Sequence, residues 1–516
     1  MNASIRTFVL IAVLGTPAAA SDWYVDANAG SNANTGTSPS QAWRTISFAV
    51  SQVPNSGIQR VFVAAGTYDS ALGESWPVMM RAQLQIIGAG PASTTLVGAS
   101  AGLIRFVANS TTSFGSDTRV EGLHLVGPGS SPSGNGVGVD AYVSYGSAYP
   151  TLVNLEIENW SFGIAATVQL SGYSSPTLES VEVHHCYTGL WVLGASYLTA
   201  TDSTFHDNVG SGISIGGAHG TPQPTFSRCR IEHNGSSGVS ESAGDYSCNP
   251  FFEDCSISFN GLHGWSSPTS ATFSDRSAEF LRTTIAFNGG KGIYGPDQFG
   301  FCGQLILSQS ILWGHTIDLD YQGTVTATRN DIGDGSFGGV NGNFAADPLF
   351  VNAANDLRLS WGSPCIDAAS TAPPAGTLDL VHHARDVDGD LDTAEVCDLG
   401  AFEFRPLEVV GPLTLGSLIQ WELRGPAGAT SVLYWSRHSL AASPTSGPFG
   451  QFDLPSLNSV FRLTTIGPSS LTTLQRSVPN SSLLVGQTFS FQALTDNALA
   501  PNGKAFSDAV QITILP

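Results

Sequence analysis

The chain of 516 residues carries a formal net charge of −21, with 41 Asp and Glu against 20 Lys and Arg. This charge excludes a nucleic-acid partner, which needs a basic surface, and favours neutral glycans, divalent ions or basic partners. An acidic polysaccharide would be repelled unless a bound cation bridged it. The hydrophobic content of 41% excludes a disordered chain, and no run after residue 20 is apolar and long enough for a transmembrane segment.

The first 20 residues have the features of an export signal. Arg6 precedes the apolar stretch Phe8 to Leu14, and Ala18 to Ala20 form a small-residue cleavage site. We therefore expect a secreted, extracellular or cell-surface protein whose mature chain begins at Ser21. The alternative is a buried N-terminal helix.

Six segments in the middle of the chain repeat one pattern. Each reads as a short β run, then Asn or a substitute, then Gly and an apolar residue, and the segments begin at Pro150, Pro176, Leu198, Pro224, Pro250 and Ala278. A unit of this size cannot bury its apolar face alone, so the repeat predicts stacked coils. The expected fold class is all-β, with a right-handed parallel β-helix.

Inward positions should remain apolar from coil to coil because strand side chains alternate between faces. One such column contains Ile157, Val183, Phe205, Ile231, Ile257 and Ile285. A polar column of Asn208, Asn234, Asn260 and Asn288 predicts an amide ladder at a bend, or alternatively a recognition site. The Gly four residues after each Asn is expected to adopt positive φ.

Polar residues gather just past the second strand of each repeat. The candidate binding residues in two neighbouring outward columns are Glu158, His184, His206, Asp207, Glu232 and His233, with Asn159 and His185 in the same columns. Imidazole and carboxylate groups on adjacent coils can bind a transition metal or share a proton. The alternative is a solvated turn edge. The pattern ends at Ser258-Phe259 and Ala286-Phe287, which is evidence against an extended groove.

In a second outward column the side-chain charge alternates in sign from coil to coil. Its residues are Asp202, Arg228, Asp254 and Arg282. This order predicts an ion-pair ladder of small energetic value at the surface. Arg228, Asp254 and Arg282 are also candidate catalytic residues, either Arg being a possible base of a polysaccharide lyase.

The segment before residue 405 contains an acidic stretch and two cysteines. Alternate carboxylates at Asp386, Asp388, Asp390 and Asp392 predict a calcium-stabilised turn, or alternatively a plain acidic loop, since the order departs from that of an EF-hand. Cys365 and Cys397 flank one loop-rich segment and form the expected disulfide. Pairing of the other cysteines is left open.

The tail from Pro406 to Pro516 differs from the repeats. Short alternating strands separated by Gly and Pro are expected at Ser417–Leu423, Thr430–Trp435, Val460–Thr465, Thr488–Leu494 and Val510–Ile514. They predict a small antiparallel β-sandwich. The expected organisation is therefore a signal peptide over 1–20, a β-helix with N-terminal cap and closure over 21–405, and a β-sandwich-like domain over 406–516.

Both ends of the helical region contain recognisable segments. WYVDANAGSNANTGTSPSQAWRTISFAV (Trp23 to Val50), VFVAAGTYD and QIIGAG resemble the start of exported bacterial β-helix proteins of the pectate-lyase-like superfamily. DPLFVNAANDLRLSWGSPCIDAAS (Asp347 to Ser370), DVDGDLD and CDLGAFEF resemble the closure of the same proteins. The resemblance implies architecture but no activity, because the superfamily contains lyases, hydrolases, epimerases and adhesins.

Two functions therefore remain open. The first is non-catalytic binding of extracellular polysaccharide or matrix material by a monomer. The second is a polysaccharide lyase or glycoside hydrolase, which would need converging carboxylates or a carboxylate–Arg pair beside aromatic residues. No such groove is evident in the sequence, which favours binding.

Overall fold

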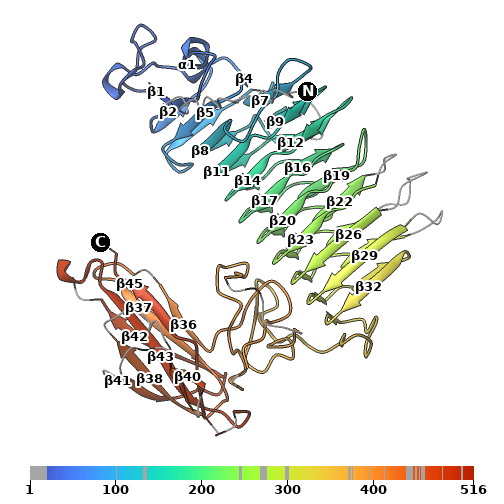
Figure 1. Ribbon diagram of the computed structural model, residues 1–516, viewed down its shortest axis with the longest axis vertical. Coiled ribbons are helices and arrows are strands. Elements are labelled where there is room, and N and C mark those ends of the chain that lie inside the picture. Colours follow the sequence, from blue (N-terminus) through green and yellow to red (C-terminus); the bar gives the residue numbers. More distant parts are fainter. Residues whose placement is uncertain are drawn as a thin grey trace, which may run out of the picture.

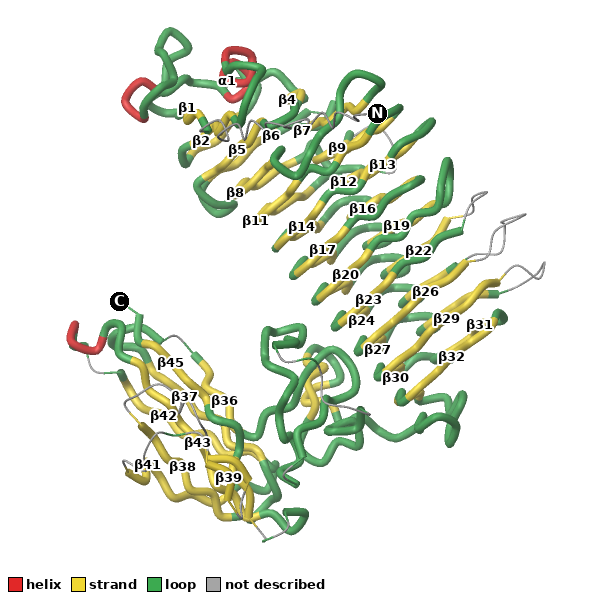
Figure 2. The backbone as a smooth tube through the Cα atoms, viewed as in Figure 1, coloured by secondary structure: helices red, strands yellow, loops and turns green. Residues whose placement is uncertain are grey.

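A computed structural model describes residues 20–515, except for 100, 132–135, 243–246, 268–275, 297–301, 370–373, 375, 393, 412, 437–444, 448–449, 453, 455–458, 479, 501 and 503. The expected export signal lies outside the described residues apart from Ala20. Figure 1 shows parallel coils stacked from the N-terminal cap to the middle of the chain, followed by separate C-terminal sheets. Figure 2 shows that strands dominate and helices are few.

The longest wall of the β-helix is a sheet of 21 described strands, here named sheet A. Strands of successive coils pair in parallel. Its strands are β1 (Ser21–Val25), β2 (Gln59–Val63), β3 (Gly66–Tyr68), β5 (Leu84–Gly88), β6 (Thr94–Val97), β8 (Arg119–Val126), β11 (Thr151–Glu158), β14 (Thr177–Glu179), β15 (Glu182–His184), β17 (Thr199–Thr201), β18 (Thr204–His206), β20 (Thr225–Ser227), β21 (Arg230–Glu232), β23 (Phe251–Glu253), β24 (Ser256–Ser258), β26 (Arg276–Leu281), β27 (Thr284–Ala286), β29 (Cys302–Ser308), β30 (Ile311–Trp313), β32 (Thr324–Thr328) and β33 (Asp331–Ile332).

A second parallel wall, sheet B, contains ten described strands. They are β4 (Val78–Met79), β7 (Ile104–Ala108), β9 (Val137–Val143), β12 (Phe162–Val168), β16 (Thr188–Leu193), β19 (Ile213–Gly216), β22 (Val239–Ser242), β25 (Trp265–Ser266), β28 (Ile293–Gly295) and β31 (Leu319–Tyr321). A short parallel pair, β10 (Ser147–Ala148) and β13 (Tyr173–Ser174), lies at a corner between the walls. The N-terminal cap contains η1 (Pro39–Gln41) and α1 (Ile46–Gln52), whose Ile46 and Ala49 join the apolar core of the coils.

The predicted inward column is confirmed by strand register. Ile231 pairs with Ile257, and Ile257 pairs with Ile285, with all three side chains fully buried. The rings of Phe226 and Phe252 stack at 4.9 Å in a second inward column. Each coil therefore covers the apolar face of the one before, which is the physical basis of solenoid stability.

The asparagine ladder is also confirmed. Asn208 Nδ2 donates to Asn234 Oδ1 at 2.9 Å, and Asn234 Nδ2 donates to Asn260 Oδ1 at 2.8 Å. Asn260 continues the ladder to Asn288 at 2.9 Å, and all four side chains are buried. The amides thus satisfy one another where the chain bends inside the core.

The reason expected for the glycines after the ladder was wrong. Gly212, Gly238 and Gly264 are not among the residues with positive φ. A Cβ on Gly238 would instead lie 2.7 Å from both Asn260 Nδ2 and Ile257 Cγ2. Glycine is needed there because the ladder and the inward column of the next coil approach its backbone closely.

Residues 347–405, here called the closure segment, fold back onto the outer face of sheet A. The segment contains an antiparallel pair, β34 (Phe350–Asn352) and β35 (Asp356–Leu359). Ala401 N donates to Thr284 Oγ1 at 2.9 Å, and the rings of Phe287 and Phe350 meet at 5.9 Å. Ala286 is buried in one apolar cluster with closure residues Leu357, Leu380, Ala401 and Phe402. This cover explains why the polar pattern ends at Ser258-Phe259 and Ala286-Phe287.

The C-terminal region forms two main antiparallel sheets that share one apolar core, which includes Trp421, Leu433 and Phe491. The tail of the chain is therefore all-β, as expected. One sheet contains β36 (Leu407–Val410), β37 (Leu418–Arg424) and β42 (Leu471–Ser477), and the other contains β38 (Thr430–Ser436), β41 (Ser459–Thr465), β43 (Thr488–Asp496), β44 (Lys504–Phe506) and β45 (Val510–Thr513). A hairpin of β39 (Thr445–Gly447) and β40 (Gly450–Phe452) and a turn, η2 (Ser482–Leu484), complete the described elements.

Candidate functional site

The candidate site lies on the exposed part of sheet A, where the outward ends of β11, β15, β18 and β21 are adjacent. The residue after each of these strands has positive φ: Asn159 at 65°, His185 at 52°, Asp207 at 50° and His233 at 56°. Asn, Asp and His are the non-glycine residues that tolerate this conformation best. The next residue then turns inward, as the buried Cys186, Asn208 and Asn234 show.

Two histidines and a glutamate converge at the second of these coils. His184 Nδ1 lies 2.6 Å from His185 Nδ1 and 4.0 Å from Glu158 Oε2. His184 Nε2 lies 3.4 Å from Glu156 Oε1, and His124 Nε2 lies 3.1 Å from Glu158 Oε1. Ligand atoms of Glu158, His184 and His185 all lie within 4.8 Å of one another. This trio has the ligand chemistry of a transition-metal site.

A second group lies on the next coil. His206 Nδ1 lies 2.7 Å from Asp207 Oδ2, and His206 Nε2 lies 2.9 Å from Glu182 Oε1. Burial lowers the pKa of His206, but the hydrogen bonds with Asp207 and Glu182 outweigh it, so the pKa is raised. Because both ring nitrogens already have carboxylate partners, His206 is held as a structural imidazole rather than presented to a ligand.

The six residues expected to bind are therefore divided by the structure. Glu158 and His184 meet, whereas His206 and Asp207 form the separate group, although the rings of His184 and His206 stack at 5.2 Å. Glu232 pairs with His206 in the register of β18 and β21. His233 stacks on Phe259 at 5.2 Å. The sequence had placed His185 in the same columns but not among the binding residues. It did not single out Glu156, Glu182 and His124, which lie two residues before the candidate column or one coil away.

The catalytic candidates Arg228, Asp254 and Arg282 are held in ion pairs. Asp254 and Arg282 are buried, with Arg282 Nε 2.8 Å from Asp254 Oδ1, so the expectation of an exposed pair here was wrong. The closure segment covers them and adds the buried Arg385, whose Nη2 lies 2.8 Å from Asp254 Oδ1. Arg228 forms two hydrogen bonds with Asp202, at 2.7 and 3.2 Å. That pairing raises the pKa of Arg228, which makes it a poor proton acceptor.

The acidic stretch of the closure contributes two of its four carboxylates to one cluster. Asp388 and Asp390 lie with Asp367 so that their oxygens are within 4.8 Å of one another, whereas Asp386 and Asp392 are exposed. Asp367 Oδ1 is buried without a hydrogen-bond partner. Burial, helped by the Asp398 carboxylate, raises the pKa of Asp367 to about 9. Three hard oxygen donors fit calcium, and Asp367 is a member that the sequence pattern did not reveal.

Calcium binding at this cluster remains a prediction. Calcium at about one hundred times its dissociation constant should stabilise the protein by about 2.7 kcal/mol, since only the folded chain brings the three carboxylates together. The melting temperature should rise with calcium relative to a chelator. Asp388→Asn should remove the rise, and the exposed Asp386→Asn should retain it. A rise of equal size in both variants would place calcium elsewhere.

The prediction of a disulfide between Cys365 and Cys397 is wrong for this structure. Both are free, buried thiols. Their segments run side by side, since Leu399 N donates to Cys365 O at 2.9 Å, but Cys365 Sγ donates to Asp331 Oδ2 at 3.3 Å. Burial raises the pKa of Cys397 to about 12. Proximity along a loop does not supply the side-chain directions that a disulfide needs.

A patch of exposed tyrosines lies where β10 pairs with β13. Tyr145, Tyr149, Tyr173 and Tyr197 are 48%, 39%, 42% and 50% exposed; the first two flank β10 on one coil, and the others follow on the next two coils. The rings of Tyr173 and Tyr197 lie 5.7 Å apart. These four residues, here called the tyrosine patch, were missed because they lie outside the six aligned segments. Clustered exposed aromatic rings mark interaction surfaces.

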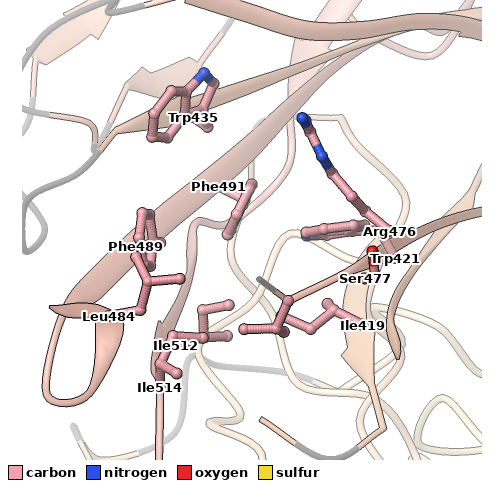
Figure 3. Close-up of a pocket in the computed structure, with 11 residues that line it drawn as sticks. Ile419, Trp421, Trp435, Arg476, Ser477, Leu484, Phe489, Phe491, Ile512 and Ile514 are labelled. Atoms are coloured by element: carbon pink, nitrogen blue, oxygen red, sulfur yellow. The ribbon is translucent and has the colours of Figure 1, made fainter. Parts of the chain in front are cut away.

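The C-terminal region contains a cavity of about 450 Å³ between its two sheets. Figure 3 shows Trp421, Phe489 and Phe491 among its walls, with Arg476 at one side. A largely apolar wall suits an apolar molecule better than a polysaccharide.

Comparisons with known proteins agree on the fold. Residues 137–341 match the family described as "Right handed beta helix region", and residues 28–219 match "Protein of unknown function (DUF1565)". No curated protein matches the sequence significantly. In the described part of the chain, no helix is long and apolar enough to cross a membrane. The chain therefore contains a right-handed parallel β-helix followed by antiparallel sheets.

The solved structures that the chain resembles have low sequence identity and low TM-scores. Pectate lyase Pel9A is 16% identical, with a TM-score of 0.42, and the match covers 74% of this chain and 96% of that one. A mannuronan C-5 epimerase A-module from Azotobacter vinelandii is 14% identical, with a TM-score of 0.29, over 59% and 96% of the two chains. A GH136 lacto-N-biosidase from Eubacterium ramulus is 10% identical, with a TM-score of 0.31, over 60% and 67%.

Proposed function

We propose that this chain is an exported or cell-surface monomer that binds extracellular polysaccharide or matrix material without cleaving it. The observation that carries the proposal is the tyrosine patch. Its rings are exposed at the corners of neighbouring coils, and Tyr173 and Tyr197 lie 5.7 Å apart. Aromatic faces can stack on the C–H faces of successive sugars, while the phenol groups hydrogen-bond to hydroxyls.

The charge of the chain favours a neutral glycan. At a net charge of −21, an anionic polymer would be repelled at long range unless cations bridge it. The solenoid also suits a polymer, because equivalent positions recur along its length and successive coils can contact successive residues of the ligand.

The proposal predicts that Tyr173→Ser combined with Tyr197→Ser lowers glycan affinity at least about tenfold, because two stacking surfaces are lost. A carbohydrate array identifies the ligand, and affinity electrophoresis measures the change. Leu262→Ser is the matched control, since Leu262 is as exposed as Tyr197 but lies outside the patch. Equal loss in the control, or none in the double variant, would contradict the proposal.

A second candidate function is a polysaccharide lyase or glycoside hydrolase. It is favoured by the convergence of Glu158, His184 and His185 on an accessible edge, where imidazole and carboxylate groups could transfer protons. Reducing-sugar and unsaturated-uronate assays on the glycans found by the array distinguish the two. Product formation that is lost in His184→Ala would establish the enzyme, and binding without product would support the first function.

A further inference from the structure

We propose that Glu158, His184 and His185 bind one first-row transition-metal ion of the Zn²⁺ class, whether or not the chain binds a glycan. The three side chains offer two imidazole nitrogens and a carboxylate oxygen within 4.8 Å of one another. Two imidazoles and one carboxylate are a common set of protein ligands for zinc. Calcium and magnesium prefer oxygen donors, so this set selects against them.

The backbone explains how two consecutive histidines reach one point. Neighbouring residues of an extended strand point to opposite faces. His184 ends β15, however, and His185 has a φ of 52°, which turns its ring back toward His184. The rings stand nearly perpendicular, at 81°, with their Nδ1 atoms 2.6 Å apart. Both nitrogens thus face the same position, where a shared proton or a metal ion can lie.

Carboxylates around the trio favour the metal-binding form of His184. Glu156 Oε1 lies 3.4 Å from His184 Nε2, so Nε2 can donate its proton there and leave the lone pair of Nδ1 available. This carboxylate–histidine arrangement is what orients metal-bound imidazoles in proteins. His124 lies 3.1 Å from Glu158 and fixes that carboxylate in turn.

The site is open on one side. His184 is buried, Glu158 is half-buried and His185 is exposed. The closure segment reaches back along the stack as far as Arg230, which lies over the Phe402 ring, and Asp202, which meets His382, whereas His185 stays exposed. Three protein ligands on an accessible edge leave a tetrahedral ion one position for water or for an oxygen of a bound molecule.

Isothermal titration of the full chain with Zn²⁺, in excess Ca²⁺ to occupy the oxygen-only cluster of the closure, tests the proposal. Wild type should bind one Zn²⁺ per chain at this site, and His185→Asn should weaken that event at least about tenfold. The replacement is compatible with the fold, because Asn159 occupies the equivalent position one coil earlier at a φ of 65°.

His233→Asn is the matched control. His233 has the same place in its coil and a φ of 56°, but it stacks on Phe259 away from the trio. The Zn²⁺ affinity of the His233→Asn variant should stay within about twofold of that of the wild type. Absence of a Zn²⁺ event in wild type, wild-type affinity in His185→Asn, or an equal loss in both variants would each overturn the site.

Discussion

Ile257→Asp is expected to unfold the central coils. Ile257 is fully buried between Ile231 and Ile285, so the change removes apolar packing and places a carboxylate where it has no partner. Loss of the side chain alone costs about 2–5 kcal/mol, and burial of an unpaired polar or charged group adds several more. That sum approaches the whole stability of a typical domain.

The effect can be measured by circular-dichroism melting and limited proteolysis. Thr199→Asp provides the control, because Thr199 is exposed on β17 in the same sheet and its replacement should change stability by only about 0.5 kcal/mol. A wild-type melting curve for Ile257→Asp would show that this column does not form the core.

Arg385→Ala is expected to detach the closure segment from sheet A. The Arg385 side chain is fully buried and contacts Asp254 Oδ1 at 2.8 Å, Glu403 Oε2 at 3.2 Å and Gly400 O at 2.9 Å. Removing it takes the cation from the buried Glu403 and leaves the buried Asp254 with Arg282 alone. Breaking a buried ion pair from one side costs about 3–5 kcal/mol, far more than the net value of an exposed pair.

Hydrogen exchange reports this loss directly. The Ala401 amide, which bonds to Thr284 Oγ1, should lose protection while the Asn260 amide inside the coils keeps it. Arg60→Ala removes a half-exposed ion pair with Asp22 and should cost at most about 1 kcal/mol. If Ala401 remained protected in Arg385→Ala, apolar contacts alone would hold the closure.

The repeat itself could be predicted because its determinants lie in neighbouring coils. Ile231, Ile257 and Ile285 occupy equivalent places in the sequence and also in space. The same holds for Asn234 and Asn260 in the ladder. The conformational reason for Gly238 was nevertheless missed, because a close approach from the next coil cannot be distinguished from a positive φ in sequence alone.

The candidate site was only partly predictable. Glu158 and His184 were identified from their columns, but the turn at His185 decides that the third ligand is its neighbour and not His206. Asp388 and Asp390 were identified by their alternation, whereas Asp367 joins them from a distant part of the closure. Spacing in the sequence identifies candidate metal ligands, and the directions of their side chains in the folded chain decide which of them lie together.

The sequence by itself determined the parallel coils, their inward columns, the amide ladder and the all-β character of the tail, because each depends on contacts that repeat with the chain. Tertiary structure decided which outward residues remain available. The closure segment returns to a strand 117 residues earlier in the chain, where Ala401 meets Thr284. It buries Asp254 and Arg282, while His185, beside the buried His184, stays exposed. The physical reason is that an outward position gains or loses solvent according to what packs on it, and the repeat places no constraint on that cover.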